Sequence, residues 1–350
     1  MSIDVCEFAA CRGITKPSRR LLYSNPMKNV TIKEVRRASE RIAGVARRTP
    51  LERSRWLSRE MSCEVSLKLE CFQVTGSFKL RGAMAKLSSL TEEERRRGVL
   101  TISAGNHGLA VAHCSEALKL DTTIVVPRSA SRAKVEAIRR YPVKLLEIGA
   151  GYDEAERAAR ELERESGMTF VSPYNDPDVI AGQGTAAIEI LEDYPDLDAI
   201  VAPTGGGGLL AGILIAAKAI KPEIEVFGVE PTTSPTMTAA LAAGAIVSID
   251  EEETIADGLA GNIEPGSMTY PIIQRLVDGV ILVAEDAIKT SIARLAREDH
   301  LIIEGSAATS IAALADERLK GKRVCAMVTG RNIALDRFCR VLEESGSLRL

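Results

Sequence analysis

Residues 75–83 read Thr-Gly-Ser-Phe-Lys-Leu-Arg-Gly-Ala and follow an alternating apolar run, Val65 to Leu69. The alternation predicts a strand, and the residues after it predict a helix with Ser77 as its N-cap. Lys79 would then lie in the first helical turn, where the helix dipole and partial burial lower the pKa of an amine. Such a lysine suits Schiff-base chemistry, although a solvated lysine is the more ordinary interpretation of this stretch taken alone.

The chain on either side of this stretch alternates between strand and helix patterns. Strands are predicted at 99–103, 122–127, 144–148, 168–172, 199–203, 225–230, 280–283 and 324–329. Helices are predicted at 31–48, 91–98, 106–118, 131–141, 153–165, 180–194, 209–219, 235–243, 287–299 and 306–320. Sustained alternation of this kind is typical of parallel sheets covered by helices on both faces, so the predicted fold class is α/β.

Linkers that carry glycine and proline, near Gly98 and between Pro173 and Pro177, divide the chain. We expect a large domain formed by residues 29–97 and 176–345, with a small domain of residues 98–175 inserted into it. Residues 1–28 lack the apolar core of a signal peptide, and we expect them to form a flexible N-terminal extension.

The composition excludes several classes of partner. A formal net charge of −3 gives no basis for binding nucleic acid or an acidic membrane surface, and no apolar run is long enough to span a bilayer. The seven cysteines are scattered and lack C-x-x-C spacing, which argues against a disulfide framework and a zinc site. Because free cysteines are typical of a reducing compartment, we expect a cytoplasmic protein without a nucleic-acid or membrane partner.

Four consecutive glycines, Gly205, Gly206, Gly207 and Gly208, follow a predicted strand and open a predicted apolar helix. Glycines allow the backbone to approach an anion closely, and a helix N-terminus presents free N–H groups. The spacing fits neither the Walker loop nor the dinucleotide fingerprint, which argues against a nucleotide-binding oxidoreductase. We favour phosphate binding here; the alternative is a close-packed turn between strand and helix.

Two further strand ends carry polar side chains. Residues 103–108 read Ser-Ala-Gly-Asn-His-Gly, and Thr329 precedes Gly330-Arg331-Asn332 at the end of the last predicted strand. Ligands of open parallel sheets bind at the carboxyl ends of strands, where these groups could hold a carboxylate or a ring hydroxyl. Asn106 could equally cap its helix, His107 could be a buried packing residue, and Thr329 could be an ordinary turn residue.

A primary amine, a phosphate cradle, an amide and a hydroxyl at neighbouring strand ends are the partners that pyridoxal phosphate needs. With residues 181–185, Ala-Gly-Gln-Gly-Thr, these motifs make the chain resemble the fold-type-II pyridoxal-phosphate enzymes. Within that family it resembles the branch of threonine and serine dehydratases and serine racemases. The motifs of that branch occur in the same order in this chain, and the likeness covers residues 30–340. Cysteine synthases and threonine synthases are weaker matches, because an Arg-Gly-Ala follows the lysine here where those enzymes usually carry Asp-Arg.

The resemblance implies the tryptophan synthase β-like fold, with two parallel-sheet domains and the cofactor between them. It implies that Lys79 forms the Schiff base with pyridoxal 5'-phosphate and that Phe78 lies beside the ring. Asn106 would hold the ring hydroxyl and Thr329 would face the pyridine nitrogen, with Glu304 near the ring. The implied phosphate ligands are Gly205, Gly206, Gly207 and Gly208, and the implied ligands of the substrate carboxylate are Ser103, Gly105, Asn106 and His107.

The resemblance also implies the reaction. A hydroxyl at Thr329 leaves the pyridine largely unprotonated, which favours loss of a β-hydroxyl directly after Lys79 removes the Cα proton. The expected activity is dehydration and deamination of a β-hydroxy-L-amino acid, such as L-threonine or L-serine, to a 2-oxo acid and ammonia. Racemases of this branch carry a serine where this chain has Ala104, and alanine cannot transfer a proton.

The identity of the substrate and the reaction stay open at this point. Residues 257–266 form a longer segment than in serine racemases, so the substrate could be an unusual hydroxy-amino acid, as in hydroxyectoine breakdown. The chain could also be a serine racemase, or a non-catalytic protein that binds pyridoxal phosphate or an amino acid. No metal site is expected, because residues 232–238 contain no acid after Glu230. A homodimer is the expectation for this family.

Overall fold

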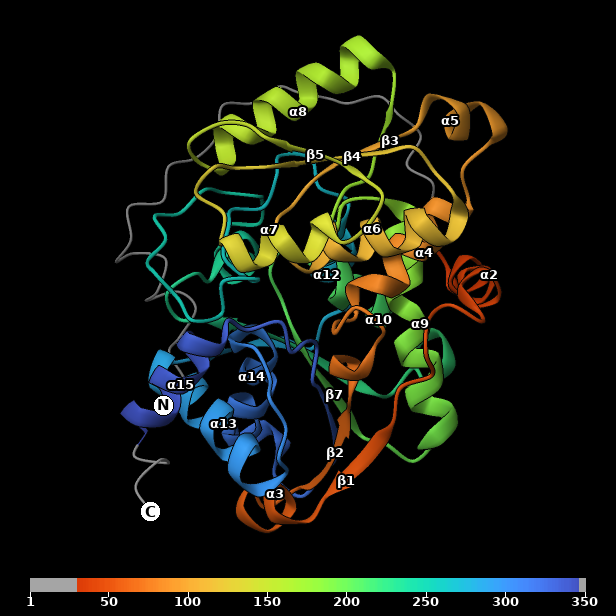
Figure 1. Cartoon of the computed structure of the whole chain (residues 1–350). Coiled ribbons are helices and arrows are strands. Elements are labelled where there is room, and N and C mark those ends of the chain that lie inside the picture. The colour runs from red at the N-terminus through yellow and green to blue at the C-terminus, as the bar shows by residue number, and fades with distance from the viewer. Residues whose placement is uncertain (1–29, 346–350) are drawn as a thin grey trace.

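The computed structural model describes residues 30–345, so the extension expected at residues 1–28 lies outside the described part. The described strands form two sheets (Figure 1), with the orders β1-β2-β10-β7-β8-β9 and β5-β4-β3-β6. The strand bounds are β1 Leu51–Ser54, β2 Glu64–Lys68, β3 Val99–Ile102, β4 Thr122–Val126, β5 Lys144–Glu147, β6 Thr169–Phe170, β7 Ala199–Pro203, β8 Glu225–Pro231, β9 Gly279–Val283 and β10 Arg323–Met327.

Neighbouring strands are parallel throughout both sheets except at one edge, where β1 pairs antiparallel with β2. The predicted α/β class with parallel sheets is therefore confirmed. The antiparallel edge arises because only the short helix α3 (Arg55–Glu60) and a turn separate β1 from β2, too short a connection for a parallel crossover. The strands of the smaller sheet all lie between residues 99 and 170, within the expected small domain. The exact boundaries of the two expected domains stay a prediction.

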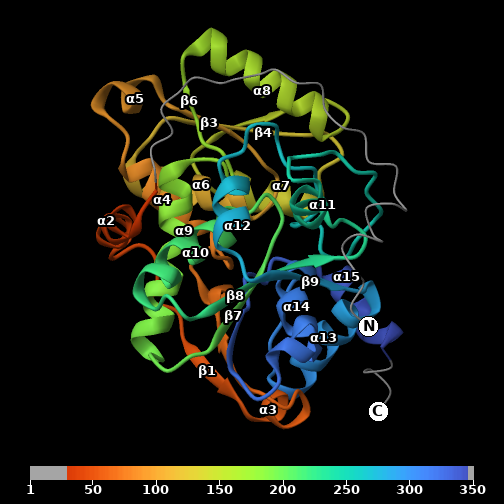
Figure 2. The same cartoon turned by 180° about the vertical axis from the view of Figure 1, so that it is seen from behind.

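Helices cover both faces of each sheet (Figures 1 and 2). Their bounds are α2 Ile32–Ile42, α4 Lys79–Ser88, α5 Glu92–Arg97, α6 Asn106–Leu118, α7 Arg132–Arg139, α8 Tyr152–Ser166, α9 Pro177–Asp193, α10 Gly208–Ile220, α11 Thr236–Ala243, α12 Thr269–Leu276, α13 Glu285–Glu298, α14 Gly305–Ala312 and α15 Leu335–Glu344.

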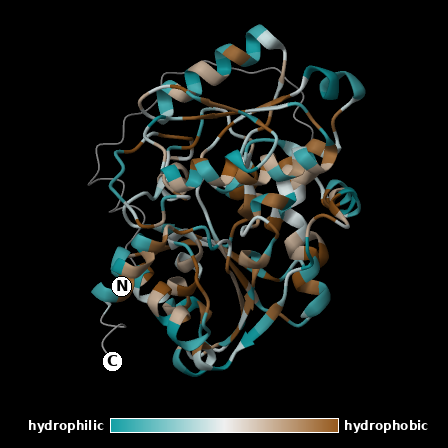
Figure 3. Cartoon of the chain, in the orientation of Figure 1, coloured by the Kyte–Doolittle hydropathy of each residue, from teal (hydrophilic) through white to brown (hydrophobic). Residues whose placement is uncertain are grey.

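Alternate residues of the central strands point to opposite faces and so belong to different cores. On β10, Cys325 and Met327 pack with α2, α4, α9 and α10, whereas Val324 and Ala326 pack with α13 and α14. The smaller sheet divides in the same way between α8 on one face and α6 with α7 on the other. Figure 3 shows the consequence, with apolar inner strands and hydrophilic outer helices such as α2 and α5.

Two predicted helix starts are confirmed, and the first has a capping motif as its physical cause. Helix α5 begins with a capping box in which the Thr91 hydroxyl accepts from the Glu94 N–H and the Glu94 carboxylate accepts from the Thr91 N–H. Gly98 ends this helix with a φ of 82°, a conformation that favours glycine. Helix α6 begins at Asn106 and ends at Leu118, as predicted.

Other predicted elements are wrong in extent. Ser77 is not the N-cap of α4; Phe78 takes that position without a side-chain cap, because residue 77 pairs with Gly330 instead. Helix α2 ends at Ile42 rather than at 48. The single helix predicted at 306–320 breaks after α14 into two short 3₁₀ turns, and Asp316 caps the second of them. Helices α3, α12 and α15 and strand β1 were not predicted.

The segment between α11 and α12, residues 244–268, contains no helix or strand. Figures 1 and 2 show it, in teal, along one side of the molecule between the two sheets. It contacts helices that pack on each of the two sheets. Asp257 accepts from Lys134 of α7, on the smaller sheet, at 2.8 Å, and the Gly258 N–H donates to Ser306 of α14, on the larger sheet, at 3.1 Å. Among residues 30–345, no helix is long and apolar enough to cross a membrane.

Candidate active site

Lys79 is placed by the pairing of two loops that lie far apart in the sequence. The Phe78 N–H donates to the Thr329 carbonyl at 3.0 Å, and the Arg331 N–H donates to the Gly76 carbonyl at 3.0 Å. Between these bonds, Ser77 and Gly330 form an antiparallel bridge. The pairing brings the end of β10 beside the start of α4, so Thr329 lies next to the turn that carries Lys79.

The amine of Lys79 lies in a partly buried environment. Its Nζ donates to the Pro173 carbonyl at 2.9 Å and lies 5.2 Å from the centre of the Phe78 ring. Burial lowers the pKa of Lys79 to about 8, while the negative charge of Glu304 acts in the opposite direction. An appreciable share of the amine is therefore neutral near physiological pH, which nucleophilic attack and proton abstraction both require.

The glycine loop follows β7 and opens α10. The N–H groups of Gly205, Gly206 and Gly207 donate no hydrogen bond to any residue within the described chain. Gly207 has a φ of +85°, and a Cβ atom at Gly206 would lie 2.5 Å from the ring of Tyr174. Close packing thus accounts for part of the glycine content, while the free N–H groups at a helix start are suited to an anion.

Asn106, at the start of α6, makes two hydrogen bonds with residues from distant parts of the chain. Its Nδ2 donates to Glu304 Oε1 at 2.8 Å, and its Oδ1 accepts from Asn332 Nδ2 at 2.6 Å. Burial raises the pKa of Glu304 to about 7, although the hydrogen bond from Asn106 opposes this. Glu304 therefore lies beside Asn106, while its position relative to the cofactor ring stays a prediction. The contact of Asn332 with Asn106 was not predicted.

The remaining predicted substrate ligands lie on either side of Asn106. The Gly105 N–H donates to the Ser103 hydroxyl at 3.1 Å. The ring of His107 is buried, its Nε2 lies 3.0 Å from the Val171 carbonyl, and burial lowers its pKa to about 3. The neutral ring of His107 is thus engaged by the Val171 carbonyl. The group of His107 that is suited to bind a carboxylate is therefore its backbone N–H, in the first turn of α6.

Two buried hydroxyls in the Lys79 loop have no hydrogen-bond partner among residues 30–345. Thr75 and Ser77 are buried, and their hydroxyls make no hydrogen bond within the described chain. Unpaired buried hydroxyls are uncommon because each one loses its bonds to water. A bound group rich in oxygen would satisfy them, and this fits a cofactor that carries a phosphate and a ring hydroxyl.

A buried ionic network supports the helix that carries Lys79. The Arg81 guanidinium donates to both carboxylate oxygens of Glu70, at 2.7 and 2.8 Å, and to both of Glu189, each at 2.7 Å. Lys68 Nζ also donates to Glu189, at 2.6 Å. Arg81, Lys68 and Glu70 are almost completely buried. In the sequence, Lys68 and Glu70 occupy polar positions of the alternating strand pattern, so nothing in the pattern indicated that they are buried or identified their partners.

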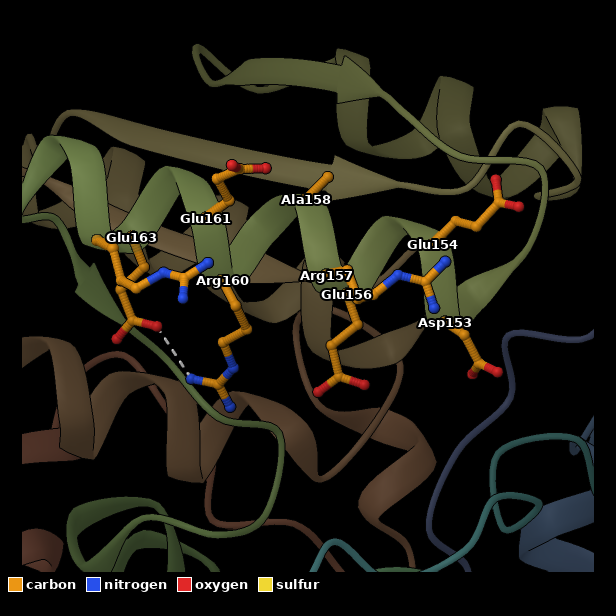
Figure 4. A pocket seen from close by; sticks show the side chains of 9 residues that line it. Asp153, Glu154, Glu156, Arg157, Ala158, Arg160, Glu161 and Glu163 are labelled. Carbon is orange, nitrogen blue, oxygen red and sulfur yellow. Dashed lines mark hydrogen bonds and ion pairs between the residues drawn. The ribbon is translucent and has the colours of Figure 1, made fainter.

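A concave region lies along a helix that packs on the smaller sheet, away from Lys79. Figure 4 shows a hollow along α8 lined by charged side chains of that one helix, among them Asp153, Glu156 and Arg157. Arg160 and Glu163, which also line it, form an ion pair at 3.1 Å. None of the predicted site residues lines this hollow, and a solvated charged helix face accounts for it.

The carboxylate of Glu230 accepts hydrogen bonds from the first turn of α11. It accepts from the N–H groups of Met237 at 2.6 Å and Thr238 at 2.8 Å, and from the Thr238 hydroxyl. Burial raises the pKa of Glu230 to about 7, and these hydrogen bonds oppose the shift. In the described part of the chain, no group of three or more His, Cys, Asp or Glu residues is arranged to hold a metal ion.

A partly buried lysine amine, free N–H groups at a helix start and buried hydroxyls without a partner among residues 30–345 fit the pyridoxal-phosphate enzymes as a class. The model of the family described as pyridoxal-phosphate dependent enzyme matches residues 42–330, and the chain belongs to this family. Its cofactor is pyridoxal 5'-phosphate.

Named relatives share most of the chain and its fold. The L-threonine ammonia-lyase of Thermotoga maritima is 38% identical over 316 residues, which cover 90% of this chain and 79% of that protein. The catabolic L-threonine dehydratase of Escherichia coli K12 is also 38% identical, over 89% of this chain and 96% of that protein. Maize serine racemase has a TM-score of 0.85 and 32% identity, covering 91% of this chain and 99% of that chain. These likenesses confirm the predicted fold type.

Proposed function

We propose that this chain is an ammonia-lyase that converts a β-hydroxy-L-amino acid, such as L-threonine or L-serine, to a 2-oxo acid and ammonia. The observation that carries the proposal is the Lys79 amine, whose pKa burial lowers to about 8, close to Glu304 and to the Thr329 loop. The relatives named threonine ammonia-lyase and threonine dehydratase support it, at 38% identity over about nine-tenths of the chain.

The residues that would hold the cofactor come from four strand ends. Lys79 would bind its aldehyde carbon, and the N–H groups of Gly205, Gly206, Gly207 and Gly208 would bind its phosphate. Asn106 would donate to the ring hydroxyl, Thr329 would face the ring nitrogen, and Phe78 would lie beside the ring. When bound, pyridoxal phosphate supplies the electron sink that makes the Cα proton of an amino acid acidic.

The protein's own groups would position the amino acid and move its protons. The first turn of α6, with Ser103, Gly105, Asn106 and the His107 N–H, would bind the substrate carboxylate. Lys79 Nζ would accept the Cα proton, because an amine of pKa about 8 is a competent base near neutral pH. Residues 257–266 would exclude water, since the backbone of Leu259 lies close to Gly205.

Two further reactions remain as second candidates. The likeness to maize serine racemase favours racemisation, but Ala104 lacks the hydroxyl that proton transfer on the second ring face would need. A dehydratase of an unusual hydroxy-amino acid is favoured by the segment at 257–266, which contacts both the glycine loop and α14. We further propose that the protein is a cytoplasmic homodimer without nucleic-acid or membrane partners. In each subunit, residues 29–97 and 176–345 would form the large domain and residues 98–175 the small domain.

The test is the release of ammonia and 2-oxo acid from a panel of L-threonine, L-serine and hydroxylated diamino acids. We expect at least one substrate to be turned over by the wild-type protein and none by Lys79→Ala. Lys86→Ala, two turns along the same helix, is the matched control and should keep the activity. Interconversion of serine enantiomers as fast as elimination would favour the racemase instead, and no turnover of any substrate would contradict the proposal.

A further inference from the structure

Asn332 is the last residue of the Thr-Gly-Arg-Asn motif, and the proposed function gives it no role. Both hydrogens of its Nδ2 group are engaged, one with the Thr75 carbonyl at 2.9 Å and one with Asn106 Oδ1 at 2.6 Å. Both of these acceptors are oxygens, so they fix the orientation of the Asn332 amide. Asn332 thereby connects the Lys79 loop with the start of α6.

This contact determines which way the amide of Asn106 faces. With Oδ1 held by Asn332 and one Nδ2 hydrogen directed at Glu304, the second Nδ2 hydrogen of Asn106 is left to donate. In the reversed orientation, Asn106 Nδ2 would meet the Nδ2 of Asn332, and its Oδ1 would meet the Glu304 carboxyl. Asn332 and Glu304 thus favour a single orientation, in which Asn106 is a donor toward the site.

The surrounding loop is shaped to admit the Asn332 side chain. Gly76 adopts a φ of +74°, and a Cβ atom there would lie 2.6 Å from Asn332 Oδ1. The Arg331 N–H donates to the Gly76 carbonyl, which holds the two loops together at this point. The absence of a side chain at residue 76 therefore leaves the space that the Asn332 amide occupies.

We propose that Asn332 is a positioning residue that orients the Asn106 amide as a hydrogen-bond donor to the ring hydroxyl of pyridoxal phosphate. This inference rests on the proposed function, because it assigns Asn106 to the cofactor ring. Asn332 itself would not contact the cofactor; it would act through Asn106.

The experiment compares full-length Asn332→Asp, Asn332→Ala, Asn106→Ala and the double variant Asn106→Ala/Asn332→Ala. Cofactor affinity is measured by titrating each protein, freed of cofactor, with pyridoxal phosphate, and the absorption maximum of the bound cofactor is recorded. The unfolding temperature of the cofactor-free protein separates local from global effects. Arg331→Ala is the matched control in the same loop, since the Arg331 side chain is exposed, lies over the Phe72 ring and makes no hydrogen bond or ion pair within residues 30–345.

We expect Asn332→Asp to weaken cofactor binding about tenfold or more, because a carboxylate cannot donate to Asn106 Oδ1. Arg331→Ala should bind like the wild type. If Asn332 acts through Asn106, the double variant should bind no more weakly than Asn106→Ala alone. Additive losses in the double variant, or wild-type affinity and absorption in Asn332→Asp, would overturn the inference.

The uncharged Asn332→Ala decides the question if the new charge of Asn332→Asp prevents folding. Failure of the inference is distinct from failure of the proposed function. In the first case the wild-type protein binds the cofactor and the Asn332 variants match it. In the second case the wild-type protein shows no absorption band of lysine-bound cofactor at all.

Discussion

At the scale of single residues, the amine of Lys79 depends on its surroundings more than on its position in the sequence. The backbone carbonyl of Pro173 accepts from it, and Glu304 is the charge that acts on it most strongly. Burial disfavours the ammonium form and so lowers the pKa, whereas the Glu304 carboxylate favours that form. The net result is an amine that loses its proton at a lower pH than a lysine in water.

The first prediction follows from that pKa. Because only the neutral amine attacks an aldehyde, the rate of cofactor capture by the cofactor-free protein should rise with pH and level off above about pH 8. The measurement is the rate at which the absorption band of bound cofactor appears, followed across the pH range on both sides of that value at one ionic strength. A rate that keeps rising well beyond it would show that Lys79 has the ordinary pKa of an exposed lysine.

Ala104 supports a second prediction. Adding a hydroxyl by Ala104→Ser should raise the rate of serine racemisation by about tenfold or more, since a positioned acid–base group typically contributes at least that much. Chiral chromatography of L-serine incubated with each protein measures it. Ala104→Gly changes the same position without adding a hydroxyl, so it should show no gain. Equal racemisation in both variants would contradict the assignment of Ala104.

At the scale of elements, the turn before α4 supports a third prediction. Gly76 and Gly44 both adopt positive φ, +74° and +82°, but only Gly76 has a neighbour within 4 Å of an added Cβ atom. Gly44→Ala should cost about 1 kcal/mol of unfolding free energy, which is the conformational cost alone. Gly76→Ala should cost about 1–3 kcal/mol more and weaken cofactor binding, because it displaces Asn332. Equal destabilisation in denaturant unfolding would contradict the close contact.

The network beneath α4 supports a fourth prediction. Arg81→Met leaves the carboxylates of Glu70 and Glu189 without their main buried partner, and this should lower the unfolding free energy by about 3–5 kcal/mol. Arg318→Met removes an arginine that is paired with Asp316 but half exposed, so it should cost about 1 kcal/mol or less. Denaturant unfolding of both variants makes the comparison, and a similar small loss in both would argue against a structural role for the network.

At the scale of the whole molecule, much of the fold could be predicted because local pattern and global architecture agree. The alternating strands and the helix start at Asn106 depend on nearby residues, and both could be predicted from the sequence. Strand β1 and helix α3 were missed because each is short and their pattern is weak. The helix predicted at 306–320 was wrong because a local cap at Asp316 outweighs the apolar spacing there.

Some features of the candidate site could likewise be predicted from the sequence, and others could not. Its strand-end motifs could be predicted, because the carboxyl ends of parallel strands converge wherever the sheet is built. The contact of Asn332 with Asn106 could not, because it joins residues 226 positions apart through the pairing of two loops. The pairing of Arg81 with Glu189 likewise depends on how α4 packs against α9. Such contacts are set by tertiary packing and leave no local pattern.

The most direct test of the central claim, that Lys79 holds the cofactor, is to locate the modified residue after borohydride reduction. The purified protein with pyridoxal phosphate is reduced, digested and analysed by mass spectrometry. We predict one phosphopyridoxyl group on Lys79, with none on that peptide in a Lys79→Ala variant and an unchanged result in Lys86→Ala. A protein that carries no such group, or carries it on another lysine while Lys79 stays unmodified, would contradict this claim.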